Sequence, residues 1–183
     1  MAGGLADALG AVLLRSDRVR QELPGAGPGS GGPVPWRTGR YSPGRVAAVY
    51  DALRGRAVDA LRHGESVVLD TSWADAGQRD AARVIASRAG ATLVELHCAA
   101  PAEVAAERLA QRTDDPSEAT PQIAALLAQQ FACWPEASTV DTSRSVAEAV
   151  AAALHRIEQR GPRPAGERTG TLGSAEPAVP AVE

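Results

Sequence analysis

The sequence contains no lysine, because each of its 19 basic residues is an arginine. This absence excludes a GxxxxGK[S/T] phosphate-binding loop from these 183 residues, since that loop uses its lysine to hold nucleotide phosphates. Cysteine is scarce: Cys98 and Cys133 are too few for a disulfide framework and are predicted to be reduced thiols. The three histidines show no metal-ligand spacing, so no metal site is predicted from them.

An excess of positive charge and long apolar runs are also missing. The formal net charge is -3, which gives no basic field for nucleic acid, so a nucleic-acid partner is not expected. No apolar stretch is long enough to span a bilayer, and the residues after Met1 do not form a secretory signal. We therefore expect a cytoplasmic protein without a membrane partner, folded as one domain over residues 1–160.

Short apolar runs alternate with amphipathic stretches along the chain. The strands predicted from this pattern are 11–14, 66–69, 92–98 and 138–140, and the helices are 17–23, 42–63, 75–89, 101–112, 115–131 and 145–160. The run 66–69 is typical of a strand buried on both faces. Residues 24–39 are rich in Gly, Pro and Ser and are predicted to form a loop, and 161–183 a disordered tail.

Polar residues mark the predicted helix starts. Ser16 is the predicted N-cap of the first of these helices, Asp75 pairs with Gln78 at another, and Ser145 with Glu148 at the last. The alternation of strands with helices predicts an α/β layered domain with a mostly parallel sheet.

Five strings follow one another in a distinctive order. They are LLRSDRVRQEL (13–23), GESVVLDTSWADAGQRDAA (64–82), LHCAAP (96–101), EVAAERLAQR (103–112) and VDTSRSVAEAV (140–150). In this order they resemble the P-loop kinases grouped with zeta toxins, gluconate kinases and polynucleotide 5'-kinases. The resemblance is strongest to the kinase-like domain that is fused behind aminoglycoside-phosphotransferase-like domains, and it covers residues 1 to about 155.

The resemblance implies a P-loop NTPase-like α/β/α fold of three layers. It also implies phosphoryl transfer from ATP, with Mg²⁺, to a hydroxyl group of a small molecule. In that family a central first strand leads into the phosphate loop, and residues 1–10 resemble the helix that follows the loop. The chain is therefore expected to begin just past the missing motif, to lack the first strand and the P-loop, and to be inactive alone.

The resemblance also implies roles for polar residues near the predicted strand ends. Those with catalytic roles are Asp17, which would orient or deprotonate the acceptor hydroxyl, Arg20, and Asp70, which would bind Mg²⁺ through water or the acceptor. Those with substrate-binding roles are Ser16, Thr71 and Arg79. The phosphate-covering lid residues are Arg108 and Arg112, and the residues near the nucleotide are Asp141 and Thr142.

Other interpretations of these residues remain open. Asp17 can simply stabilise a helix start, Asp70 can cap a turn, and Arg79 can be a surface residue. The whole chain can be a non-catalytic module that binds a partner, such as an aminoglycoside-phosphotransferase-like domain. It can also be a Mg²⁺-dependent hydrolase that uses Asp17 and Asp70 without a P-loop.

Overall fold

The computed structural model describes residues 1–24, 42–111 and 131–160. Residues 115–130 of the predicted helix 115–131, most of the predicted loop 24–39, the predicted tail 161–183 and the lid candidate Arg112 lie outside the described residues.

Helices and strands alternate along the described chain, as predicted. In order they are α1 (Ala2–Leu9), β1 (Val12–Arg15), α2 (Ser16–Glu22), α3 (Pro43–Arg62), β2 (Val67–Asp70), α4 (Ala76–Arg88), β3 (Leu96–Ala99), α5 (Ala102–Ala110), β4 (Ser138–Asp141) and α7 (Val146–Gln159). The predicted strand 92–98 was too long, because β4 offers only four residues to pair with β3.

Two of the three predicted capping signals are confirmed. The Asp75 side chain accepts a 3.0 Å hydrogen bond from the backbone N–H of Gln78, and Ser145 with Glu148 forms a reciprocal capping box. The prediction for Ser16 is wrong. Arg15 is the N-cap residue of α2, because β1 extends one residue further than expected, and Ser16 is therefore the first helical residue.

The four strands form two separate parallel sheets of two strands each. In one sheet Val12 lies opposite Val67 and the register ends at Arg15 and Asp70; in the other, β3 pairs with β4. The parallel direction is confirmed, but one continuous sheet is not observed among the described residues. Every residue of β2 is half-buried and none is fully buried, since β1 is its only pairing partner in the described chain.

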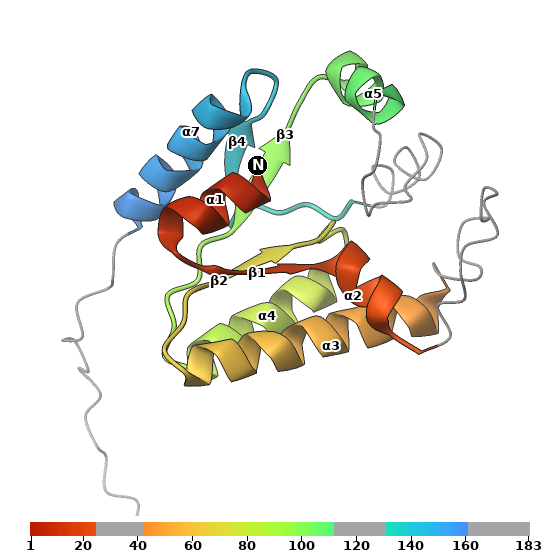
Figure 1. Ribbon diagram of the computed structural model, residues 1–183, viewed down its shortest axis with the longest axis vertical. Helices are drawn as coiled ribbons and strands as arrows, with labels where there is room; N and C mark the ends of the chain where they lie inside the picture. Colours follow the sequence, from red (N-terminus) through yellow and green to blue (C-terminus); the bar gives the residue numbers. More distant parts are fainter. Residues whose placement is uncertain (25–41, 112–130, 161–183) are drawn as a thin grey trace, which may run out of the picture.

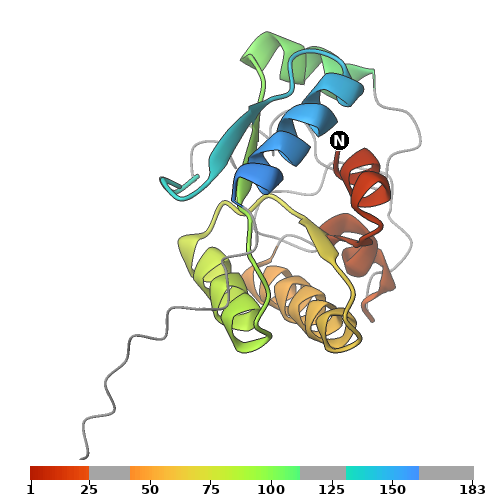
Figure 2. The same cartoon turned by 90° about the vertical axis from the view of Figure 1, so that its left-hand side faces the viewer.

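The helices cover both faces of this arrangement, which gives the predicted three layers. Helices α3 and α4 lie side by side below β1 and β2, and α1 and α7 lie on the opposite side (Figure 1). In the view turned by 90°, β2 lies between α1 and α3, and β4 lies beside α7 (Figure 2). Among the described residues, none of the helices combines the length and the hydropathy that a membrane span requires.

Two apolar clusters hold the layers together. The first joins α1 to α7 and to the second sheet, and its buried members are Leu5, Val140, Ala149 and Ala153. The second joins α2 to α3 and is built on Val19, Val49 and Leu53. Helix α1 contacts β1 and β2 as well as α7, so it connects the two sheets.

Replacing Leu5 by alanine tests this connection. Leu5 is 4% exposed, so we expect Leu5→Ala to lower the free energy of unfolding by about 2–4 kcal/mol through lost apolar burial and an unfilled cavity. Leu9→Ala is the matched control, because Leu9 lies on the same helix but is 37% exposed. Urea denaturation compares the two variants, and equal losses of stability would contradict the proposed role of α1.

Candidate functional site

Charged side chains gather at the carboxyl edge of the β1–β2 sheet. Arg15 and Asp70 lie directly opposite each other in the register, and the Nε atom of Arg15 is 3.2 Å from Oδ2 of Asp70. Both side chains are about two-fifths exposed, so the pair faces solvent at the mouth of the sheet. In parallel α/β sheets this edge is where ligands bind.

Helix α2 adds a second pair beside this edge. Asp17 and Arg20 form an ion pair within the helix, as their spacing predicted. The Asp17 side chain remains 29% exposed, whereas Ser16 is buried with 7% of its surface exposed. The carboxylate of Asp17 can therefore be reached from solvent, whereas the Ser16 side chain is buried at the first residue of α2.

Aromatic residues lie next to Thr71, one of the predicted substrate-binding residues. The hydroxyl of Thr71 donates a 3.0 Å hydrogen bond to the buried Tyr50 hydroxyl, and the Tyr50 ring lies 5.6 Å from that of Trp73. Trp73 has φ 49°, the one positive φ found among the non-glycine residues that the structure describes. A bulky residue in this region is strained, and such strain concentrates at functional sites.

Arg79 is buried, which makes the surface interpretation wrong. Only 3% of its surface is exposed, and its guanidinium donates hydrogen bonds to the backbone carbonyls of Trp73, Ala132 and Cys133. It therefore binds protein atoms, and the substrate contact implied by the resemblance stays a prediction.

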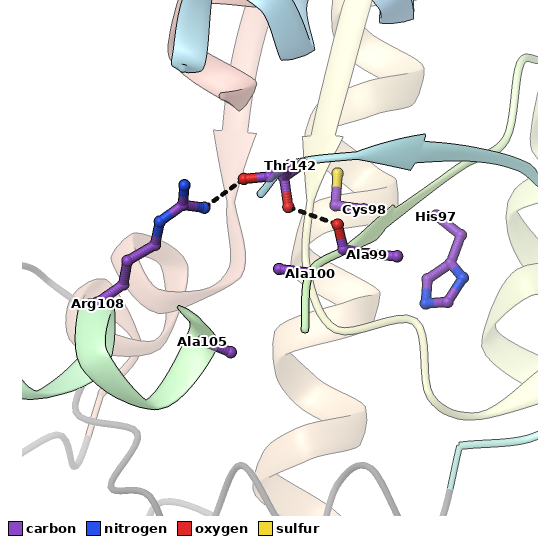
Figure 3. A pocket seen from close by; sticks show the side chains of 7 residues that line it. All are labelled: His97, Cys98, Ala99, Ala100, Ala105, Arg108 and Thr142. Atoms are coloured by element: carbon purple, nitrogen blue, oxygen red, sulfur yellow. Dashed lines mark hydrogen bonds between the residues drawn. The ribbon is translucent and has the colours of Figure 1, made fainter. Parts of the chain in front are cut away.

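A pocket of about 460 Å³ opens at the carboxyl edge of the β3–β4 sheet. Its lining includes His97, Cys98, Ala99, Ala100, Ala105, Arg108 and Thr142. Figure 3 shows Arg108 reaching from α5 toward the loop that follows β4. Two of the predicted residues, the lid candidate Arg108 and the nucleotide candidate Thr142, thus meet at one cavity.

Hydrogen bonds to backbone carbonyls fix the side of this pocket formed by the loop after β4. Arg108 donates to the carbonyls of Thr142, Ser143 and Arg144. The Thr142 hydroxyl donates to the carbonyl of Ala99 at 2.9 Å. Arg108 therefore ties α5 to the loop after β4, and the phosphate contact implied by the resemblance stays a prediction.

Asp141 is held in its charged form at the end of β4. Hydrogen bonds from Ser143, through its hydroxyl and through its backbone N–H at 2.8 Å, keep the pKa of this carboxyl below its usual range. Because its pKa is lower in the folded state, this interaction favours folding above the pKa of the unfolded chain. The benefit is lost as the pH falls through the folded value.

The two polar edges interact electrostatically through Asp70 and Cys98. Burial raises the pKa of the Cys98 thiol, and the negative charge of Asp70 adds to this increase. The Sγ atom of Cys98 also lies 3.5 Å from Sδ of Met1. Asp70 at the first edge therefore acts electrostatically on a residue that lines the pocket at the second.

Sequence reasoning missed several residues around these edges. Tyr50 lies in the predicted helix 42–63, and His97 and Cys98 lie in the predicted strand 92–98, so none of them was a site candidate. All three nevertheless border the polar residues described above. For His97 and Cys98 the available signal was their position at the carboxyl end of a predicted strand, whereas the sequence places Tyr50 near no strand end. The strain at Trp73 had no sequence signal, because a glycine is the usual residue at a positive φ.

Solved structures share this architecture. The chain has a TM-score of 0.62 and 21% identity to a sugar kinase from Janibacter sp., over 88% of this chain and 87% of that one. For a gluconokinase from Sinorhizobium meliloti the TM-score is 0.56 at 20% identity, over 86% and 83% of the two chains. A putative kinase from Chloroflexus aurantiacus gives 0.58 at 20%, over 87% and 89%.

The fold is therefore that of the P-loop kinases, in an α/β form with parallel strands. The profile of an AAA domain family matches residues 1–135, and the chain belongs to that family. Uncharacterised proteins of Mycobacterium tuberculosis and Mycobacterium bovis are 36% identical over 155 residues, which is 85% of this chain. The chain spans only 31% of the length of these curated relatives.

The Asp141 site yields a test by titration. Ser143→Ala removes the hydroxyl donor, so we expect the pKa of Asp141 to rise toward its ordinary value, though the backbone N–H still holds part of the shift. Carboxyl carbon chemical shifts followed against pH measure this value. Ser145→Ala is the control, because Ser145 hydrogen-bonds Glu148 instead; an unchanged Asp141 pKa in Ser143→Ala would contradict the assignment.

Proposed function

We propose that this chain supplies the acceptor and lid sides of an ATP-dependent kinase that phosphorylates a hydroxyl group of a small molecule. The observation that carries this proposal is the pair of polar edges at the carboxyl ends of the parallel strands. One edge holds Asp17 and Asp70, and the other holds Arg108 beside a pocket. Membership of the AAA domain family and the likeness to kinase structures support the same reaction class.

Asp17 is the proposed general base. Its carboxylate is partly exposed and paired with Arg20, and it is the group that would accept a proton from the acceptor hydroxyl. Arg20 fixes the carboxylate in place. Because phosphoryl transfer depends mainly on positioning and charge neutralisation, a fixed carboxylate beside the acceptor is the contribution needed from this edge.

Asp70 is the residue that would hold Mg²⁺. A single carboxylate with waters suits this ion, which keeps much of its hydration shell, and the solvent-facing side chain of Asp70 leaves room for those waters. Bound there, Mg²⁺ would neutralise charge on the transferring phosphates. Arg15 limits the geometry, because it already binds Oδ2 of Asp70.

The binding site for the ATP phosphates is the part of the kinase that these residues do not supply. A phosphate loop needs backbone N–H groups and a lysine, and the 183 residues contain no lysine. We infer that this binding site comes from residues outside the given sequence, and that the chain alone is inactive. The greater length of the mycobacterial relatives is consistent with further segments, and an aminoglycoside-phosphotransferase-like domain remains the proposed partner.

Nucleotide calorimetry tests the missing phosphate-binding site. We expect no measurable heat of binding from MgATP with the 183-residue chain, because the phosphate loop and its lysine are lacking. A form extended upstream by a strand and a GxxxxGK[S/T] loop should bind MgATP at micromolar strength. Micromolar binding by the chain alone would overturn the inference, and a folded extended form that still fails to bind would favour the non-catalytic partner module.

The role of Asp17 is tested in the same extended form. Asp17→Asn should lower kcat by about 10²–10⁴-fold through loss of the proton acceptor, with MgATP affinity unchanged. Gluconate and simple sugars are the acceptors to try first, because the structural neighbours are described as a gluconokinase and a sugar kinase. Asp7→Asn on the exposed part of α1 is the matched control, and an equal loss there would remove the assignment.

A further inference from the structure

Arg79 occupies an unusual position for a charged residue. It lies on the first turns of α4, yet 97% of its surface is covered by other parts of the chain. Nη1 donates to the carbonyl oxygens of Trp73 at 2.8 Å and Ala132 at 3.3 Å, and Nη2 donates to that of Cys133 at 2.9 Å. One guanidinium thus binds two segments that are more than 50 residues apart in sequence.

Aromatic rings complete its surroundings. The Cζ atom of Arg79 lies 5.0 Å from the ring centroid of Trp134 and 5.8 Å from that of Phe131. Both distances are within the range of a cation–π interaction, which is strongest when the cation is shielded from water. Phe131 in turn stacks on His97 with centroids 4.9 Å apart, and His97 lines the pocket at the β3–β4 edge.

The segment bound on the other side is the turn between β2 and α4, residues 71–75, which we call the β2–α4 turn. It contains the strained Trp73, whose carbonyl accepts the shortest of the three Arg79 hydrogen bonds. The turn is also joined directly to the distant segment, because the N–H of Ala132 donates to the carbonyl of Ala74 at 3.1 Å. Strain of this kind persists only where surrounding contacts enforce it.

We infer that Arg79 is a positioning residue that holds the β2–α4 turn in its strained form and fastens it to residues 131–134. The turn follows Asp70 directly and includes Thr71, so its conformation fixes the acceptor edge. Residues 131–134 reach the pocket through His97, so Arg79 couples the two edges. The meaning of this coupling for phosphoryl transfer rests on the proposed function, whereas the coupling itself rests on the contacts alone.

Direct contact between Arg79 and a substrate is the competing role. Three protein carbonyls already use three of its five N–H donors, and two aromatic rings cover it, so a substrate would reach it only if the turn opened. A purely structural role is the other competitor. It predicts that loss of Arg79 lowers the stability of the whole domain without a selective effect on the turn.

Amide hydrogen exchange on the full 183-residue chain, followed by NMR, separates these roles. In Arg79→Ala we expect the N–H of Ala132 to exchange about tenfold faster or more. The local opening that exposes this amide costs less free energy in the variant, because no Arg79 hydrogen bonds have to be broken. The indole N–H signals of Trp73 and Trp134 should shift as well. Two variants serve as controls. Leu5→Ala destabilises the apolar cluster between α1 and α7, to which Arg79 does not belong, and Arg88→Ala removes an exposed arginine from the same helix as Arg79.

Chemical rescue makes the test sharper. Arg79→Ala leaves a space bordered by carbonyl oxygens and aromatic rings, which suits a guanidinium ion. Guanidinium chloride well below its denaturing concentration should restore slow exchange at Ala132, whereas equal urea or sodium chloride should not. If Arg79→Ala fails to fold, Arg79→Lys serves instead: it keeps the charge but cannot span three carbonyls, and the same local acceleration is expected.

An Ala132 amide that exchanges no faster in the Arg79 variants than in Leu5→Ala at matched stability would overturn the inference. Selective acceleration in the controls would overturn it equally. Because exchange and rescue require no nucleotide, acceptor or activity, they stand if the proposed kinase function fails. Conversely, kinase activity in the extended form together with an Ala132 amide that is unaffected by loss of Arg79 would support the proposed function and contradict the coupling.

Discussion

The packing of α1 is the constraint on which the rest of the structure depends. This helix contacts both strands of the first sheet and also α7, which covers the second sheet, so it sets how the two halves face each other. Leu5 is the buried centre of that contact, and Gly4 allows it: a Cβ there would stand 3.2 Å from Val150. Without this packing the two sheets would lose the helix that contacts both of them.

Much of the fold could be predicted because its signals are local. The caps at Asp75 and Ser145 are short-range hydrogen bonds between residues three positions apart, and such patterns can be recognised in the sequence. The carboxyl ends of the four strands could be placed to within one residue, whereas the start of β3 was placed four residues too early. Ser16 was misassigned because the end of β1 is set by the pairing of Arg15 with Asp70, a contact between residues far apart in the chain.

The candidate site could be predicted only in part. Asp17 and Asp70 were identified from their positions near predicted strand ends, and the structure places both near one edge. The environments of Arg79 and Arg108 could not be predicted, because each binds carbonyls more than 30 residues away. Carbonyl groups occur at every residue, so the sequence carries no sign of which ones a given arginine will reach.

The half-buried strand β2 has a consequence for the behaviour of the isolated chain. Val67, Val68 and Leu69 form an apolar strand whose second edge has no pairing partner among the described residues. Unpaired edges of this composition are templates on which another copy can add a strand. The isolated chain therefore has, within its described residues, an apolar strand edge at which a further strand can extend the β1–β2 sheet.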